Sequence, residues 1–207
     1  MIAIIGAGPA GSYLAYLLKN NGHEVELFEE HKVVGKPVQC TGIITSSVES
    51  LIKVPEELIV NYISRVNIIA PDGNNVEIKF RNKNKILDRA KFDQHLVDIA
   101  ERSGVKVNLG KSFESLSREH NLKIKFKDNT LIEVDKVVGA DGPFSKVAKF
   151  AGLFSDRKFI QAIQARVRMN VEPDTITMYP GIGEFAWIVP ENDNIARVGI
   201  ATVEKNP

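Results

Sequence analysis

The sequence predicts an α/β fold with two parts: a parallel sheet with flanking helices, and a second, mostly antiparallel sheet. Three observations carry this prediction. A short apolar run at residues 2–5 leads into a glycine-rich turn and a helical pattern, and another apolar run follows at 25–29. A similar strand and turn recur at 134–147, and β-rich runs separated by Pro, Gly, Asp and Asn fill residues 158–203. Strands that alternate with helices are typical of parallel sheets, whereas successive β-rich runs are typical of antiparallel ones.

The composition is that of an ordinary globular protein. The chain has 207 residues, 43% hydrophobic content and a formal net charge of +1, and its basic residues are scattered. That distribution argues against a nucleic-acid partner, which needs a basic patch. A single cysteine makes no internal disulfide, so we expect the cytoplasm. No apolar run reaches the roughly 18 residues of a spanning helix, so any membrane contact is expected to be peripheral. The histidines show no metal-ligand spacing.

The chain begins with a predicted βαβ unit. Residues 2–5 are a strand, and residues 25–29 are a second strand in which apolar and acidic residues alternate before Phe28. The helix between them carries leucines on one face. We expect it to end at Asn21-Gly22, because both residues tolerate left-handed backbone angles.

The turn after the first strand has the pattern GxGxxG, Gly6-Ala7-Gly8-Pro9-Ala10-Gly11. Gly6 allows the sharp turn, Gly8 lets a pyrophosphate approach the backbone, and Gly11 lets the helix pack close to the sheet. The helix N-terminus offers unpaired N–H groups to phosphates. Glu29 ends the second strand and is placed to bind a ribose diol. The pattern predicts a Rossmann-like dinucleotide-binding unit, and by itself it does not choose between FAD and NAD.

Residues 134–147, VDKVVGADGPFSKV, predict a strand, a Gly-Ala-Asp-Gly turn and a helix that Ser145 opens. Asp141 stands at the strand end, where ligands gather in open α/β sheets, although a plain Asp-Gly turn is the alternative. The segment resembles the Gly-Asp segment of FAD enzymes of the para-hydroxybenzoate hydroxylase type. This resemblance implies an FAD cofactor, with Asp141 and Gly142 near the flavin ribose.

Two segments between these units fit the same resemblance. Residues 87–107 predict a helix that ends at Ser103-Gly104 and then a strand. The resemblance implies that Arg89, before this helix, contacts the phosphate and ribose of FAD, and a solvated arginine is the alternative. Residues 122–135 alternate around a polar turn and predict a β-hairpin, where the superfamily has a small β-meander.

The stretch KPVQCTGII, residues 36–44, holds the lone cysteine, Cys40. Its Gln-Cys-x-Gly sequence resembles the geranylgeranyl reductase family, which includes archaeal enzymes that saturate the isoprenoid chains of membrane lipids. GIGEFAWIVP, residues 181–190, resembles the YxWxFP-type segment of that family, with Trp187 in place and with Phe185 and Val189 departing from the pattern.

The family resemblance also implies a set of site residues. The cofactor contacts are Gly6, Gly8, Ala10, Gly11, Glu29, Cys40, Thr41, Arg89, Asp141 and Gly142. Cys40 would lie beside the flavin ring as the catalytic candidate, whereas a buried cysteine that acts as a small hydrophobe is the alternative. Phe185 and Trp187 would line the substrate channel, and ordinary core packing is the alternative for Trp187.

The expected FAD-binding domain comprises residues 1–60 and 81–157, and the substrate-binding sheet comprises 61–80 and 158–207. A hairpin around Pro71-Asp72-Gly73 is expected to join that sheet. Relatives carry a further Gly-Asp-Ala segment beyond this point, so we expect the sheet to be incomplete and the chain to be a fragment.

The function expected from the resemblance is FAD-dependent saturation of geranylgeranyl chains in archaeal-type lipids. The expected partners are an isoprenoid lipid substrate and an external electron donor, NAD(P)H or ferredoxin. Two alternatives stay open: an FAD-dependent monooxygenase of the aromatic hydroxylase type, and a truncated FAD-binding module without catalytic activity.

Overall fold

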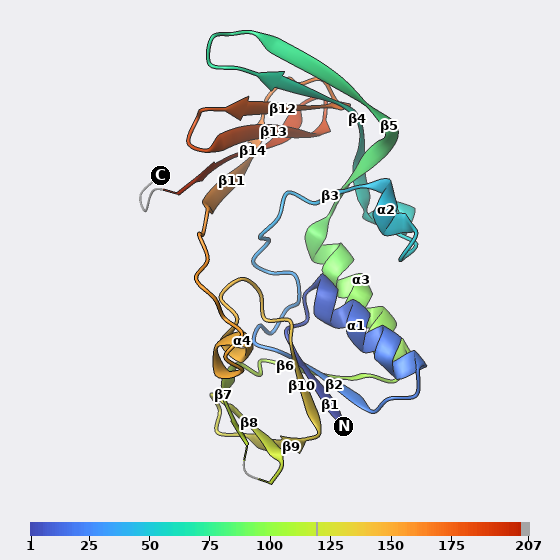
Figure 1. Cartoon of the computed structure of the whole chain (residues 1–207). Helices are drawn as coiled ribbons and strands as arrows, with labels where there is room; N and C mark the ends of the chain where they lie inside the picture. Colours follow the sequence, from blue (N-terminus) through green and yellow to red (C-terminus); the bar gives the residue numbers. More distant parts are fainter. Residues whose placement is uncertain (119, 204–207) are drawn as a thin grey trace. The chain divides into compact units, whose positions relative to one another are not determined.

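The structure is a computed structural model that describes residues 1–118 and 120–203 (Figure 1). The chain divides into two compact units. The first unit comprises residues 1–38 and 90–156, and the second comprises 39–89 and 157–207. The final residues, 204–207, which the sequence analysis assigned to the second sheet region, lie outside the described residues. None of the helices in the described part of the chain is long and apolar enough to cross a membrane.

The first unit is built on a parallel sheet in the order β10-β1-β2-β6. Its strands are β1 (Ile2–Ile5), β2 (Val25–Glu29), β6 (Lys106–Leu109) and β10 (Lys136–Gly139). Because Ile5 pairs with Gly139, the turns that follow β1 and β10 leave the sheet at adjacent positions. The GxGxxG turn and the Gly-Ala-Asp segment therefore meet at the carboxyl edge of the sheet, although most of the chain separates them.

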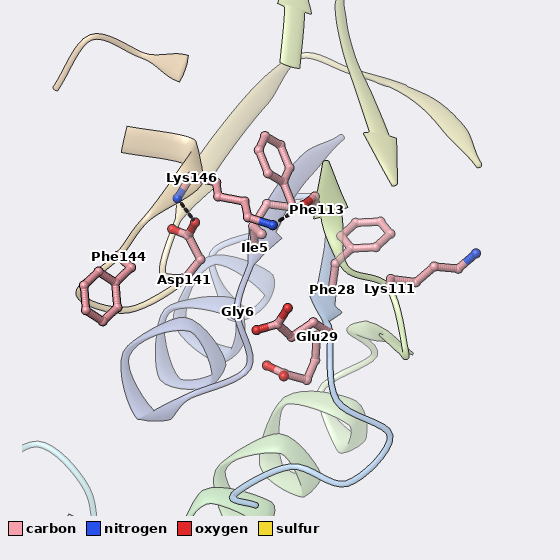
Figure 2. A pocket seen from close by; sticks show the side chains of 10 residues that line it. Ile5, Gly6, Phe28, Glu29, Lys111, Phe113, Asp141, Phe144 and Lys146 are labelled. Carbon is pink, nitrogen blue, oxygen red and sulfur yellow. Dashed lines mark hydrogen bonds between the residues drawn. The ribbon is translucent and has the colours of Figure 1, made fainter. Parts of the chain in front are cut away.

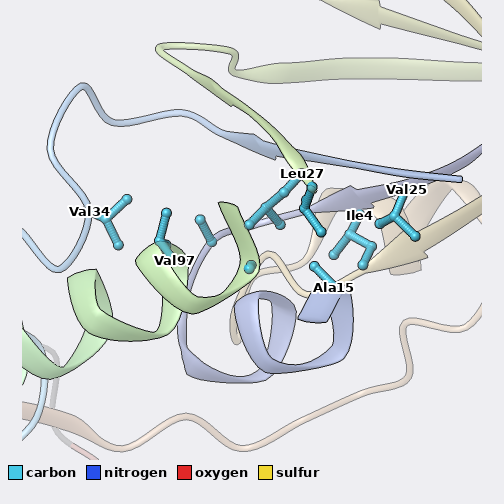
Figure 3. Close-up of a cluster of buried hydrophobic side chains, with 9 residues drawn as sticks. Ile4, Ala15, Val25, Leu27, Val34 and Val97 are labelled. Carbon is cyan, nitrogen blue, oxygen red and sulfur yellow. The ribbon is translucent and has the colours of Figure 1, made fainter. Parts of the chain in front are cut away.

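Helices α1 (Pro9–Asn20) and α3 (Arg89–Arg102) cover one face of this sheet. Figure 3 shows Ile4, Val25 and Leu27 of the strands facing Ala15 of α1 and Val97 of α3. Ile4, Ala15 and Leu27 are fully buried, and burying an aliphatic side chain contributes about 1.5–3 kcal/mol. This core holds the N-terminus of α1 close to the end of β1.

The opposite face of the sheet is covered by an antiparallel meander and a short helix. The meander runs β7 (Phe113–Arg118), β8 (Leu122–Phe126) and β9 (Leu131–Val134), and the helix is α4 (Lys146–Phe150). The predicted hairpin is confirmed as β8–β9, and Asn129 in its turn has a φ of 65°. Phe28 of β2 stacks on Phe126 of β8 with ring centroids 4.9 Å apart.

The second unit is a mixed, mostly antiparallel sheet in the order β11-β14-β13-β12-β4-β5-β3, in which β4 and β12 run parallel. Its strands are β3 (Ile43–Ile44), β4 (Ile59–Ile69), β5 (Asn75–Leu87), β11 (Gln161–Arg168), β12 (Thr175–Pro180), β13 (Phe185–Asn192) and β14 (Ile195–Thr202). The short helix α2 (Ser46–Glu49) and the 3-10 turn η1 (Glu56–Leu58) lie between β3 and β4. Ile63, Ile86, Ile176 and Val189 form its buried core.

The predicted fold class is confirmed, since a Rossmann-like α/β unit and a mostly antiparallel sheet are both present. The hairpin around Pro71-Asp72-Gly73 is also present, between β4 and β5. The bounds of the second unit differ from the expected ones. It includes residues 39–60 and 81–89, because β5 extends to Leu87 and β3 pairs with β5.

Candidate functional site

The glycines of the GxGxxG turn differ in what surrounds them. Gly6 has a φ of +104°, and a Cβ there would lie 2.3 Å from the carbonyl oxygen of Ala140. A Cβ on Gly11 would lie 1.9 Å from the carbonyl oxygen of Gly6, so these two glycines allow close packing. Gly8 caps α1, and no atom lies within 4 Å of the place where its Cβ would be. The space in front of Gly8 and the α1 N-terminus is therefore open, which suits an approaching pyrophosphate.

Glu29 lies at the end of β2 with 9% exposure, and its carboxylate is held by neighbouring donors. Its Oε2 accepts the Ala7 N–H at 2.8 Å, while its Oε1 accepts the His31 N–H at 2.9 Å and contacts His31 Nδ1 at 2.6 Å. A carboxylate offers about four acceptor positions, so one remains for a ribose hydroxyl. The sequence analysis did not identify His31 as a partner of Glu29.

Asp141 follows β10 and has a structural task. Its Oδ1 accepts the Ser145 hydroxyl at 2.5 Å, and its Oδ2 accepts the N–H groups of Lys146 at 2.7 Å and Val147 at 3.1 Å. The carboxylate thus caps α4, together with Ser145, whose hydroxyl accepts the Ala148 N–H. The neighbouring Gly142 is exposed with a φ of +79°.

Glu29 and Asp141 line one pocket at the carboxyl edge of the parallel sheet (Figure 2). The full lining is Ile5, Gly6, Phe28, Glu29, Glu30, Lys111, Phe113, Asp141, Phe144 and Lys146. Lys111 lies two residues after the end of β6 and Phe113 begins β7, and the sequence analysis missed both. Their position after a parallel strand is the signal that identifies them, because ligands bind beyond the carboxyl ends of such strands. A nucleotide fits here: an open turn, a helix N-terminus and a fixed carboxylate meet at one edge. Ala10, in the first turn of α1, is exposed beside them.

The remaining predicted residues belong to the second unit. Cys40 is exposed, which removes the alternative of a buried cysteine in the core. Thr41 donates its hydroxyl to Oε1 of Gln164 at 2.9 Å. The Arg89 side chain lies beside Gly42, since a Cβ on Gly42 would lie 3.2 Å from Arg89 Cγ. Arg89 therefore lies beside the segment that carries Cys40 and Thr41.

Phe185 and Trp187 form a pair on β13, with ring centroids 5.6 Å apart. Trp187 packs against the core of the second unit, and a Cβ on Gly199 would lie 2.2 Å from its Cζ2, so the indole lies directly over Gly199. Nε1 of Trp187 is buried and has no hydrogen-bond partner within the described residues. The indole therefore packs against the core, as in the alternative that the sequence analysis gave for Trp187, and its place in a substrate channel stays a prediction.

The fold and the residues at its parallel-sheet edge define a Rossmann-like dinucleotide-binding protein, and residues 4–40 match the family model described as NAD(P)-binding Rossmann-like domain. Digeranylgeranylglycerophospholipid reductase 2 of Methanosphaera stadtmanae is 29% identical over 98% of this chain and 56% of that protein. An uncharacterised protein in the nifH2 5′ region of Methanosarcina barkeri is 30% identical over 73% of this chain and 87% of that protein. The chain belongs to the family of these proteins, the geranylgeranyl reductase family.

A solved structure agrees with this assignment. The geranylgeranyl bacteriochlorophyll reductase-like protein of Thermoplasma acidophilum superimposes with a TM-score of 0.87 and 25% identity, covering 98% of this chain and 56% of that one. The chain thus spans about half the length of the curated reductases it matches.

Proposed function

We propose that this protein is an FAD-dependent reductase that saturates the double bonds of geranylgeranyl chains in archaeal-type membrane lipids. The observation that carries the proposal is the extent of the likeness to digeranylgeranylglycerophospholipid reductase, which covers 98% of this chain. It therefore includes the second sheet as well as the nucleotide-binding unit, which many enzymes of other activities share.

In this proposal the cofactor is FAD. Its pyrophosphate lies in the open space before Gly8 and the α1 N-terminus, beside Ala10, and Glu29 accepts a ribose hydroxyl. Asp141 and Gly142 shape the same edge, while Cys40, Thr41 and Arg89 form a second group of cofactor contacts. Reduced FAD supplies the hydride for an alkene carbon, and the protein supplies position and exclusion of water.

The substrate in this proposal is an isoprenoid lipid, and Phe185 and Trp187 contribute to its apolar surface. Each buried CH₂ contributes about 0.8 kcal/mol, so a long isoprenoid favours such a surface over water. Cys40, with its exposed thiol, donates a proton or holds the reacting group in place. The electron donor is NAD(P)H or ferredoxin, and contact with the membrane surface is peripheral.

The test uses the purified chain, FAD and a digeranylgeranyl phospholipid in detergent, with dithionite as the reductant. We expect a flavin absorbance band on the protein and a lipid whose mass rises by two hydrogens for each double bond lost. Bound flavin with unchanged lipid would favour the binding-module alternative. Oxygenated lipid formed from reduced protein and oxygen would instead support a monooxygenase.

A further inference from the structure

The residues around Cys40 form a turn, Gln39–Gly42, which we term the Cys40 turn. It is held at each of its last three residues. The Gly42 N–H donates to Sγ of Cys40 at 3.4 Å, and the Gly42 carbonyl accepts the Leu87 N–H at 2.9 Å. Gly42 has a φ of +88°, and a Cβ there would lie 2.6 Å from the Leu87 carbonyl oxygen. The turn is therefore packed tightly against the end of β5.

Arg197 of β14 fixes this turn from the other side. Its Nη1 donates to the carbonyl of Thr41 and, at 3.1 Å, to the carbonyl of Leu87. One guanidinium nitrogen thus joins the turn to the end of β5. Arg197 has only 12% of its side chain exposed, so these bonds are largely shielded from water.

Glu191 of β13 in turn fixes Arg197. Its Oε1 accepts Nε of Arg197 at 2.8 Å, and its Oε2 accepts Nε of Arg166 at 2.6 Å. Glu191 is 8% exposed and Arg166 is 64% exposed, so Arg197 is the inner partner and Arg166 the outer one. Since the planar guanidinium directs its donors in fixed directions, the Glu191 bond sets where Nη1 points.

The strand register places the Cys40 turn over the face that carries the aromatic pair. Gln164 pairs with Gly199, and Gly199 pairs with Trp187. Directly paired residues lie on the same face of a sheet, and so do residues two apart on one strand, such as Gly199 and Arg197 of β14. Gln164, Trp187 and Arg197 therefore lie on one face. Thr41 is bonded to both Gln164 and Arg197 on that face.

We infer that Arg197, oriented by Glu191, is a positioning residue that fixes the Cys40 thiol over the Phe185–Trp187 face. The placement of the thiol by Arg197 is independent of the proposed function. The role of that thiol in turnover rests on the proposed reductase function.

The sequence allows a direct measurement, because Cys40 is the single cysteine and takes a thiol-specific nitroxide without any further substitution. Arg197→Met removes the guanidinium that donates to the Thr41 carbonyl, so the turn should move more freely. We expect several-fold faster nitroxide motion by electron paramagnetic resonance. Arg166→Met is the matched control: it removes the outer partner of Glu191 and leaves the bond to Thr41, so the spectrum should stay as in the parent. The measurement needs neither FAD nor lipid, which separates its failure from failure of the proposed function.

A second variant keeps the test valid if Arg197→Met fails to fold. Arg197→Lys keeps the charge beside Glu191, but its one nitrogen cannot take the places of both Nε, which bonds Glu191, and Nη1, which bonds the two carbonyls. Nitroxide motion should therefore be intermediate and thermal unfolding cooperative. Hydrogen exchange of the Gly42 and Leu87 amides should rise several-fold in the same variant without any label. An Arg197→Met or Arg197→Lys protein with parental nitroxide motion and parental exchange would overturn the inference, as would an equal change in Arg166→Met.

Discussion

Gly8 and Gly11 belong to the same GxGxxG pattern, and they should respond differently to an added side chain. Gly8 has extended backbone angles and open space before it, so Gly8→Val should change the free energy of unfolding by only about 0.5 kcal/mol. The valine nevertheless fills the place of the pyrophosphate, so FAD affinity should fall at least tenfold. Gly11→Ala places Cβ against the Gly6 carbonyl and should cost about 1–3 kcal/mol.

Thermal denaturation and flavin titration of both variants check this prediction. If Gly8→Val binds FAD as tightly as the parent, the pyrophosphate does not bind at this turn.

Cys40 offers a second test at the residue scale. It is exposed, so Cys40→Ala removes little packing and should leave the unfolding temperature within a few degrees of the parent. If the thiol lies beside the flavin, the same change should shift the flavin absorbance spectrum or slow its reduction by dithionite. Stopped-flow absorbance measures both the spectrum and the reduction rate. If both equal those of the parent, Cys40 does not lie beside the flavin.

At the scale of elements, β13 and β14 depend on the contact between Trp187 and Gly199. Gly199→Ala would place a methyl group 2.2 Å from Cζ2 of the indole, and it would also approach the Ile163 carbonyl, so the ring must move. We expect a loss of about 1–3 kcal/mol in the free energy of unfolding. Trp187 is the single tryptophan, so a shift in intrinsic fluorescence reports its displacement directly.

Ala165→Gly on the exposed side of β11 is the control for this change, since it alters a neighbouring strand away from the indole. Its emission maximum should match that of the parent. Parental emission from Gly199→Ala as well would mean that the indole does not lie over Gly199 in solution.

At the scale of the whole molecule, paired carboxylates should make stability depend on pH. Burial raises the pKa of Glu191, but the hydrogen bonds and charges of Arg197 and Arg166 outweigh burial and hold this pKa below its ordinary value. The hydrogen bond from Arg65, followed by that from Ser64, lowers the pKa of Asp174 further still. Because the folded state binds these protons less readily than the unfolded chain, the stabilisation is complete above the ordinary carboxyl pKa values and is lost as pH falls through the lowered ones.

Denaturation with urea between about pH 6 and pH 2 measures this dependence. Glu191→Gln should be less stable at neutral pH and should lose less stability on acidification than the parent. Glu184→Gln, at an exposed position before β13, should follow the parental curve. Parallel curves for Glu191→Gln and the parent would show that Glu191 does not titrate differently on folding.

The sequence was sufficient where structure is local. The glycine turn, the end of α1 at Asn21 and the β8–β9 hairpin follow from residues that are near neighbours in the chain. The link from Arg197 to Glu191 and Thr41 could not be predicted, because it depends on the register of β13 and β14 and on a turn far away in sequence. Two contacts between near neighbours are exceptions that the sequence analysis also missed: Asp141 caps α4, and Glu29 holds His31.

The pairing of β1 with β10 and of β4 with β12 also has a consequence for synthesis on the ribosome. The first sheet needs residues 136–139 before β1 has both neighbours, and the second needs residues 175–178 before β4 has its parallel partner. Since β4 and β5 are made before either event, their hairpin must wait with one edge open while the first unit closes. The nascent chain therefore completes its nucleotide-binding unit first, and a translational pause before β12 would expose the open edge of β4 to other chains.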